Sequence, residues 1–302
     1  MNFKVIAVLA IILSFCCIAF SCQTMAAVTD IGAQVAAAAG VVDQNIADAI
    51  SQSAKAISTA AEEITPEQEY YIGRAVAANI LNNYRLWNGN AALTTYLNHI
   101  CAAITINSPR PEIYSRYRVA ILDSSEVNAF ATSGGHIFVT RGLINAAKTE
   151  DALAGVIAHE VAHIQLMHSI KAIKNSRITQ ALLITGASAA GAATGMNVAQ
   201  LTEVFNESIG EIVQTLVTSG YSQAQEFEAD NTAMSLMAGA GYNPQGLIEM
   251  LRSLSTVQMG SAGFGKTHPT PAQRIANAER SVSRYRVTDS STRQARFITA
   301  TR

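Results

Sequence analysis

The sequence is poor in cysteine and almost balanced in charge. It has four Cys among 302 residues, and three of them, Cys16, Cys17 and Cys22, lie near the N-terminus. Only Cys101 remains for the folded region, so we expect a buried free thiol there and no internal disulfide. The formal net charge is −1. Lys and Arg form no basic stripe, which argues against a nucleic acid partner.

Long apolar runs are also scarce, and the clearest one opens the chain. Residues 1–21 carry one Lys, then an apolar run and small residues, as is typical of a secretory signal. The run Ala19–Cys22 resembles a bacterial lipobox, which predicts Cys22 as a lipidated first residue. Cleavage farther on, for example after Ala26, and retention as a membrane anchor are the alternatives. We expect the Ala-rich residues 22–64 to form helices or a spacer.

The main chemical signal is the motif H-E-x-x-H, formed by His159, Glu160 and His163. Residues four apart lie one above the other on a helix, so the two imidazoles can bind a single metal ion. Glu160 points into the adjacent sector, where it can act as a general base on a water molecule at the metal. The motif therefore supplies two zinc ligands and a base.

The context of this motif argues against a chance match. Thr149 is a good helix N-cap, and Glu150 and Asp151 follow it, where negative charge suits the helix dipole. Residues 152–167 are apolar almost everywhere outside the motif, so we expect a helix that is buried on most sides. Burying two His and a Glu is costly unless they are paired or bound to a metal, which favours a metal site.

A catalytic zinc site needs a third protein ligand and one open position. Glu226 and Asp230 are four residues apart on one predicted helix face, whereas Glu228 points elsewhere. We predict Glu226 as the third ligand and Asp230 as a hydrogen-bond partner of a ligating His. A solvated acidic helix face is the alternative. A His-His-Glu donor set favours zinc, with one ion per chain.

Together these motifs resemble the zinc metallopeptidases of family M48, which include HtpX, the Oma-type mitochondrial proteases and the CAAX prenyl proteases. Four blocks occur in the family's order: Asn128–Ile144, the helix with His159 and His163, Glu226–Asp230, and His268–Ile275. We see no set of long transmembrane helices and no tetratricopeptide repeat. The resemblance is therefore to the soluble periplasmic members without such repeats.

The resemblance implies a mostly helical α+β fold, with a zincin-like domain and a small β-sheet beside the H-E-x-x-H helix. Glu160 would accept a proton from water and return it to the leaving amine. His268 would lie near the metal, either stabilising the oxyanion or plugging the open position. Stacking of His268 on its own Pro is the alternative. Arg274 would pair with an active-site carboxylate, and a surface salt bridge is its alternative.

Two short strands are predicted within residues 128–140, joined by a tight turn at Ser133-Gly134-Gly135. By resemblance, the first is an edge strand beside the zinc. A substrate polypeptide could add to it in extended form at Asn128, Ala129 and Phe130. An ordinary hairpin that only packs on the catalytic helix is the alternative.

Helix-start signals place the beginning of the catalytic domain at Thr65, where Thr65 and Gln68 form a capping-box pattern. We expect this domain to cover residues 65–286 and a poorly ordered polar tail to cover residues 287–302. The remaining histidines, His99, His136 and His168, receive no role. His168 in particular would lie off the ligand face of its helix.

The sequence thus predicts a zinc endopeptidase that acts on misfolded or unassembled envelope proteins. We expect it in the bacterial periplasm, anchored as a lipoprotein and preferably at the outer membrane. A chaperone or assembly factor with a largely latent zinc site is the main alternative. A structural zinc protein with four permanent ligands is another.

Overall fold

The computed structural model describes residues 22–40, 43–45, 47–48, 51–52, 64–106, 108–171, 209–210, 212–257, 267–268 and 271–301. The chain divides into two compact units, residues 1–64 with 172–208 and residues 65–171 with 209–302. The predicted signal segment, residues 1–21, lies outside the described residues. In the first unit, helix α2 (Cys22–Ala38) begins at the predicted lipidation residue. Among the ranges just given, no helix is long and apolar enough to cross a membrane.

The second unit begins at Thr65 and opens with helix α4 (Pro66–Asn83). Thr65 is its N-cap, and the side chains of Thr65 and Gln68 form the predicted capping box. Pro66 sits in the first turn, where its missing N–H costs no helical hydrogen bond. The predicted helix start is therefore confirmed.

A three-stranded sheet lies beside the helices, in the order β1-β3-β2. Strand β1 (Arg118–Leu122) pairs in parallel with β3 (His136–Thr140), and β2 (Ala129–Thr132) pairs antiparallel with β3. Gly134 and Gly135 have φ angles of 79° and 97°, which a residue with a side chain rarely adopts. The predicted hairpin is confirmed, and β2 is an edge strand of this sheet.

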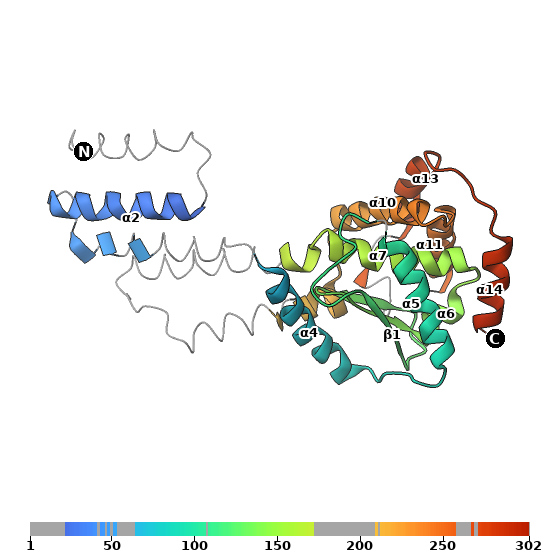
Figure 1. The fold of residues 1–302 in the computed structure, drawn as a ribbon. Coiled ribbons are helices and arrows are strands. Elements are labelled where there is room, and N and C mark those ends of the chain that lie inside the picture. Colours follow the sequence, from blue (N-terminus) through green and yellow to red (C-terminus); the bar gives the residue numbers. More distant parts are fainter. Residues whose placement is uncertain are drawn as a thin grey trace. The chain divides into compact units, whose positions relative to one another are not determined.

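Helix α7 (Glu150–Gln165) carries the H-E-x-x-H motif and is buried from Glu150 to Ile164. The hydroxyl of Thr149 accepts a hydrogen bond from the backbone N–H of Ala152, which confirms the predicted N-cap. Helices α10 (Gln223–Gly239) and α11 (Gln245–Val257) pack on one side of α7, and the sheet and α5 (Ala91–Ile106) pack on others (Figure 1). The motif therefore lies in the hydrophobic core.

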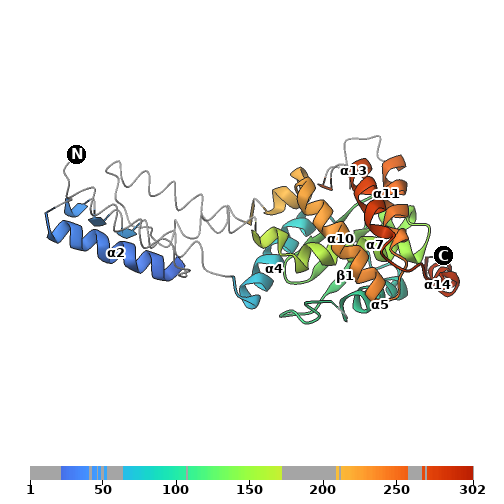
Figure 2. The same cartoon turned by 90° about the horizontal axis from the view of Figure 1, so that it is seen from above.

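The remaining elements complete a mostly helical α+β fold, as predicted. They are α6 (Arg141–Ala146), the short π-helix η2 (Thr215–Ser219), α13 (Pro271–Val282) and α14 (Ser291–Thr301). Figure 2 shows α13 beside α10 and α11, which it contacts. This contact brings the C-terminal part of the chain to the helix that carries Glu226.

The prediction of a poorly ordered tail is wrong. Helix α14 packs against α7 and α5, and its Phe297 is buried. Arg293 Nε donates to Asp151 Oδ1 over 2.8 Å, and Arg296 pairs with Glu150. The tail is polar in sequence because it contains basic residues. These side chains pair with the acidic first turn of α7, and this contact joins segments far apart in the chain.

Candidate metal centre

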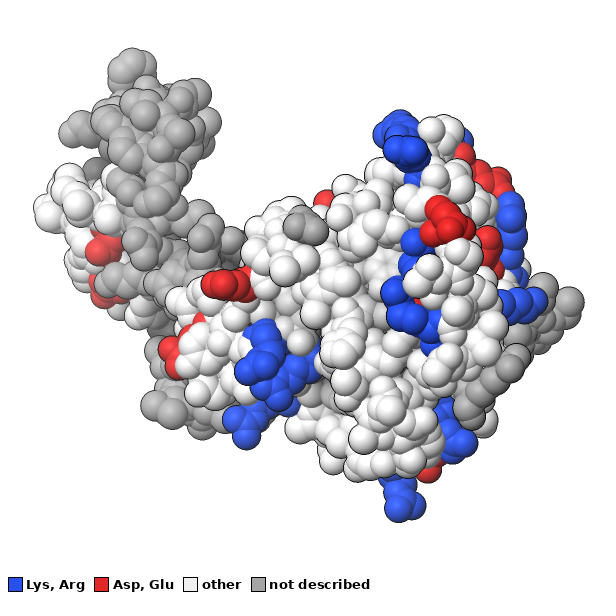
Figure 3. All heavy atoms as spheres, turned by 45° about the vertical axis from the view of Figure 1, so that its right-hand side comes forward, with Lys and Arg blue, Asp and Glu red and all other residues white. Residues whose placement is uncertain are grey.

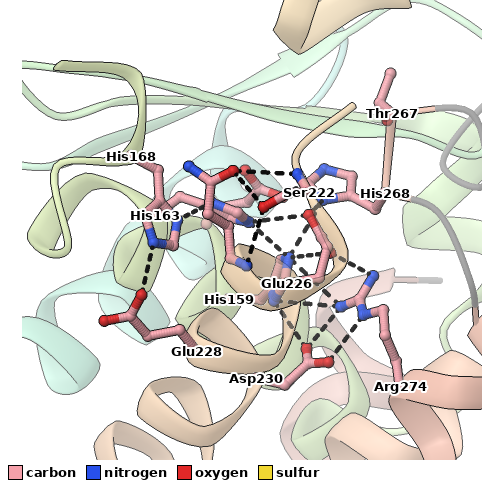
Figure 4. A network of polar contacts seen from close by, with 12 residues as sticks. His159, His163, His168, Ser222, Glu226, Glu228, Asp230, Thr267, His268 and Arg274 are labelled. Carbon is pink, nitrogen blue, oxygen red and sulfur yellow. Dashed lines mark hydrogen bonds and ion pairs between the residues drawn. The ribbon is translucent and has the colours of Figure 1, made fainter. Parts of the chain in front are cut away.

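Helix α7 brings His159 and His163 together as the motif predicts. Their Nε2 atoms are 3.0 Å apart, and both side chains are about 1% exposed (Figure 4). The spacing of four residues places both rings on one face of the helix. Two imidazole nitrogens thus face the same small volume in the core.

Helix α10 supplies the two predicted carboxylates. Glu226 Oε2 lies 3.4 Å from His159 Nε2, and Glu226 Oε1 lies 3.4 Å from His163 Nε2. One turn later, Asp230 Oδ1 lies 2.9 Å from His159 Nδ1. Neither carboxylate is exposed to solvent, so the alternative of a solvated acidic face is wrong. Asp230 contacts the ring nitrogen of His159 that points away from Glu226.

His268 joins this group from the chain segment before α13. Its Nδ1 lies 3.0 Å from Glu226 Oε1 and 3.3 Å from His159 Nε2. Its Nε2 lies 3.5 Å from Glu160 Oε1. One donor atom from each of His159, His163, Glu226 and His268 lies within 4.8 Å of the other three. The structure therefore assembles four groups that could hold a metal, the three predicted ligands and His268.

Arg274 of α13 is fully buried against the same carboxylates. Its Nη1 lies 2.9 Å from Glu226 Oε2, and its Nη2 lies 2.6 Å from Asp230 Oδ1. The Nε atom also donates to Asp230 Oδ2 over 2.8 Å. The alternative of a surface salt bridge is wrong. Arg274 connects the proposed ligand Glu226 to Asp230, the partner of His159.

The electrostatics of this cluster favour a positive charge on His159 and a neutral ring at His163. Burial and Arg274 act to lower the pKa of His159, but hydrogen bonds with Asp230 and Glu226 outweigh them and raise it to about 9. Burial acts to raise the pKa of Glu226, yet His268 and Arg274 hold it well below its usual range. Burial lowers the pKa of His163 well below its usual range, which keeps that ring neutral.

These residues fit a zinc ion. Neutral imidazole nitrogens and a carboxylate oxygen are the donors that catalytic zinc sites use. Glu160 is 1% exposed, and its Oε1 makes no hydrogen bond to the described residues. Burial raises the pKa of Glu160. Glu160 is thus a buried carboxylate beside the donor group, and its Oε1 accepts no hydrogen bond from the described residues. Such a carboxylate suits a base that acts on water.

The predicted substrate strand also lies next to the site. The side-chain Oδ1 of Asn128 accepts a hydrogen bond from Thr267 Oγ1 over 3.1 Å, and Thr267 directly precedes His268. Asn128, Ala129 and Phe130 are each at most 1% exposed. The edge strand β2 contacts α7, so the hairpin does pack on the helix that carries the motif. A role in substrate binding stays a prediction.

Three residues near the predicted metal ligands, His168, Glu228 and Tyr221, have no role in the sequence prediction. His168 Nδ1 lies 2.8 Å from His163 Nδ1, and His168 Nε2 lies 3.3 Å from Glu228 Oε2. The ring of Tyr221 stacks on His163, with centroids 4.1 Å apart. The expectation that His168 lies away from the ligands assumed a continuous helix, but α7 ends at Gln165. A third histidine so soon after the motif was the available signal.

Comparisons with known proteins agree with this site. The model of peptidase family M48 matches residues 89–282. Metalloprotease LoiP of Escherichia coli (strain K12) is 32% identical over 152 residues, which are 50% of this chain and 57% of LoiP. Mitochondrial metalloendopeptidase OMA1 of Schizosaccharomyces pombe (strain 972 / ATCC 24843) is 27% identical over 189 residues, 62% of this chain and 52% of OMA1.

A third relative aligns over more of the chain. The beta-barrel assembly-enhancing protease of Escherichia coli (strain K12) is 24% identical over 252 residues, which are 80% of this chain and 50% of that protease. The chain thus spans about half the length of these curated relatives. The family match covers more than half of the chain. It includes His159, His163, Glu226 and His268, the four side chains that could hold a metal ion, which we call the metal cluster. The chain therefore belongs to peptidase family M48, a family of metalloproteases.

Proposed function

We propose that this chain is a zinc-dependent endopeptidase that hydrolyses peptide bonds of misfolded or unassembled envelope proteins. The observation that carries the proposal is the buried group of His159, His163, Glu226 and His268, with the carboxylate of Glu160 beside it. Such a donor group with an adjacent base is what metal-assisted hydrolysis requires. Family membership supports the reaction class.

The roles of the side chains follow from their positions. His159, His163 and Glu226 would hold the zinc ion, which when bound lowers the pKa of water and polarises a carbonyl oxygen. Glu160 would accept the proton of the attacking water and return it to the leaving amine. Asp230 would keep the Nε2 lone pair of His159 turned toward the metal by accepting its Nδ1–H. Arg274 would hold both carboxylates in place.

The substrate class rests on recognition of main chain. An extended polypeptide could add to the edge of β2 at Asn128, Ala129 and Phe130, which favours unfolded chains over folded ones. Because these residues are buried, this edge would have to open before a substrate could bind. The name of the beta-barrel assembly-enhancing protease supports an envelope substrate.

The proposed location is the bacterial periplasm, with an outer-membrane lipid anchor on Cys22. The support is the lipobox-like run before Cys22 and the name of the beta-barrel assembly-enhancing protease. Figure 3 shows, on the face drawn, small groups of Lys and Arg separated by wide uncharged areas. The absence of a nucleic acid partner stays a prediction.

The proposed reaction is tested by casein degradation with the purified full-length chain. Wild type, Glu160→Gln and Glu249→Gln are compared, with bound zinc quantified in each. Glu249 is an exposed glutamate of α11 and serves as the matched control. We expect about one zinc per chain in all three and cleavage lost only in Glu160→Gln. Zinc binding without cleavage in wild type would contradict the peptidase proposal.

His268 supports a second candidate, a chaperone or assembly factor with a latent zinc site. A zinc ion held by four protein groups has no open position for water in a tetrahedral site. Removing a plugging His268 by His268→Ala would raise casein cleavage, whereas removing a catalytic His268 would lower it. Retention of the cellular function in Glu160→Gln would favour the chaperone.

A further inference from the structure

The second metal-ligand histidine has an outer partner unlike that of the first. His159 directs its outer nitrogen at a buried carboxylate, Asp230. His163 directs its Nδ1 at another imidazole, that of His168, over 2.8 Å. His168 in turn directs its Nε2 at Glu228 Oε2, 3.3 Å away. Glu228, His168 and His163 therefore form a line of three groups, which we name the outer relay, that ends at the metal cluster (Figure 4).

With a metal on His163 Nε2 and both rings neutral, one proton arrangement satisfies every contact of the outer relay. The Nε2 atom of His163 faces His159 and Glu226, so a metal held there would take its lone pair and leave the ring proton on Nδ1. His163 then donates to His168 Nδ1, which must accept. A neutral His168 that accepts at Nδ1 carries its proton on Nε2, and this proton is donated to Glu228.

The backbone is shaped to bring His168 into this position. Helix α7 ends at Gln165, and Met167 has a φ angle of 57°, in the left-handed region. That conformation is uncommon for a residue with a side chain. It turns the chain back so that His168, fully buried, lies against His163. Strained residues of this kind persist where the surroundings hold them and cluster at functional sites.

The ring of His163 is also held from its face. Tyr221, which precedes α10, stacks on it with an interplanar angle of 16° and a centroid distance of 4.1 Å. The stack restricts tilting of the ring, whereas the hydrogen bond at Nδ1 restricts its rotation. Together, Tyr221 and His168 leave His163 one orientation, in which its Nε2 points at the metal cluster.

We propose that His168 and Glu228 are positioning residues that fix the proton and orientation of His163 for metal binding. This inference rests on the proposed function, since it assigns the two residues a task at the same zinc site. Hydrogen bonds of this kind raise the basicity of the ligating nitrogen, and their loss commonly lowers metal affinity about 10–100-fold. Glu228 is 52% exposed, so its own contribution is the smaller one.

The test compares two nearly isosteric substitutions in the full-length chain. His168→Leu removes the acceptor for His163, whereas His168→Asn keeps an oxygen at the position of Nδ1. Zinc affinity and the zinc dissociation rate are measured by competition with a fluorescent chelator. We expect about 10–100-fold weaker binding for the Leu variant and recovery of most of that affinity in the Asn variant. The zinc affinity of Glu228→Gln should lie between those of His168→Asn and wild type.

Controls separate positioning from folding. His99→Leu changes an exposed histidine of α5 and should leave zinc affinity unchanged. Thermal unfolding of the metal-free Leu and Asn variants should give similar midpoints, since the difference between them concerns the metal.

Two results would overturn the inference. They are wild-type affinity in His168→Leu and equal losses of affinity in the Leu and Asn variants. A wild-type chain that fails to bind zinc would instead overturn the proposed function, and the inference with it.

Discussion

Both ends of α7 bury charged residues, but the two ends differ in the numbers of carboxylate and guanidinium groups. At the N-terminal end, Glu150 and Asp151 are at most 5% exposed, and Arg296 and Arg293 of α14 pair with them. Two carboxylates thus meet two guanidinium groups. The phenol of Tyr96 donates a further hydrogen bond to Glu150. The charges at this end therefore neutralise one another, as in a network with a structural role.

At the motif end, negative groups outnumber the guanidinium groups. Glu160, Glu226 and Asp230 lie around the two motif histidines, and Arg274 is the guanidinium that pairs with the latter two. The pKa of His159 is raised to about 9, so this end favours an additional positive charge. The comparison teaches that burial of charge alone does not mark a site. An excess of one sign, held rigidly, indicates where a cation would bind.

The largest expected effect comes from removing the cation of the motif end. Arg274→Met leaves Glu226 and Asp230 buried without their guanidinium partner. We expect the metal-free protein to lose roughly 3–5 kcal/mol of unfolding free energy, measured by urea denaturation in the presence of a chelator. Arg252→Met is the matched control, because Arg252 and its partner Glu279 are both about half exposed. That variant should change stability by at most about 1 kcal/mol. Equal losses of unfolding free energy in the two variants would refute the claim that Arg274 balances two buried carboxylates.

A medium effect is expected when the outer partner of His159 loses its charge. Asp230→Asn keeps the shape of the side chain but weakens its hold on the Nδ1–H of His159 and on Arg274. Zinc affinity should fall about 10–100-fold in chelator competition. Asp123→Asn, in an exposed pair with Arg141, is the control and should bind zinc normally. The idea fails if Asp230→Asn perturbs zinc binding less than Glu228→Gln does.

The smallest effect is expected at the N-terminal end. Arg293→Met removes the charged partner of Asp151, which keeps its hydrogen bond from the backbone N–H of Asn243, and should lower the unfolding free energy by about 1–2 kcal/mol. Zinc affinity should stay at the wild-type value, since α14 pairs with the other end of α7. Urea denaturation and chelator competition on the same preparation check both statements. If the free energy of zinc binding falls by more than the free energy of unfolding, the two ends of α7 are coupled.

Local signals predicted a large share of this protein. The capping box at Thr65, the N-cap at Thr149 and the glycine turn at residues 134–135 each formed as expected. These signals act between residues a few positions apart, so a single sequence carries them. The motif on α7 and the carboxylates on α10 were predictable for the same reason, because helical spacing decides which side chains share a face.

The errors arose where local rules stop applying. His168 was placed by helical spacing beyond the residue at which α7 ends, and Met167 then turns the chain. The sequence predicts a polar tail where α14 forms, because Arg residues are usually solvated and only the packed structure shows that Glu150 and Asp151 of α7 pair with them. In both cases the deciding contacts belong to the packed structure.

By itself, the sequence determined the kinds of donor atoms, the helices that carry them and the reaction class they suggest, because capping and periodicity operate within a few residues. Only the tertiary structure decided that His268, 109 positions beyond His159, lies 3.3 Å from it, and that Arg274 is buried against Glu226 and Asp230. Those distances depend on how α10 and α13 pack on each other and how α10 packs on α7. Such packing is set by the summed burial of many side chains, which no single motif encodes.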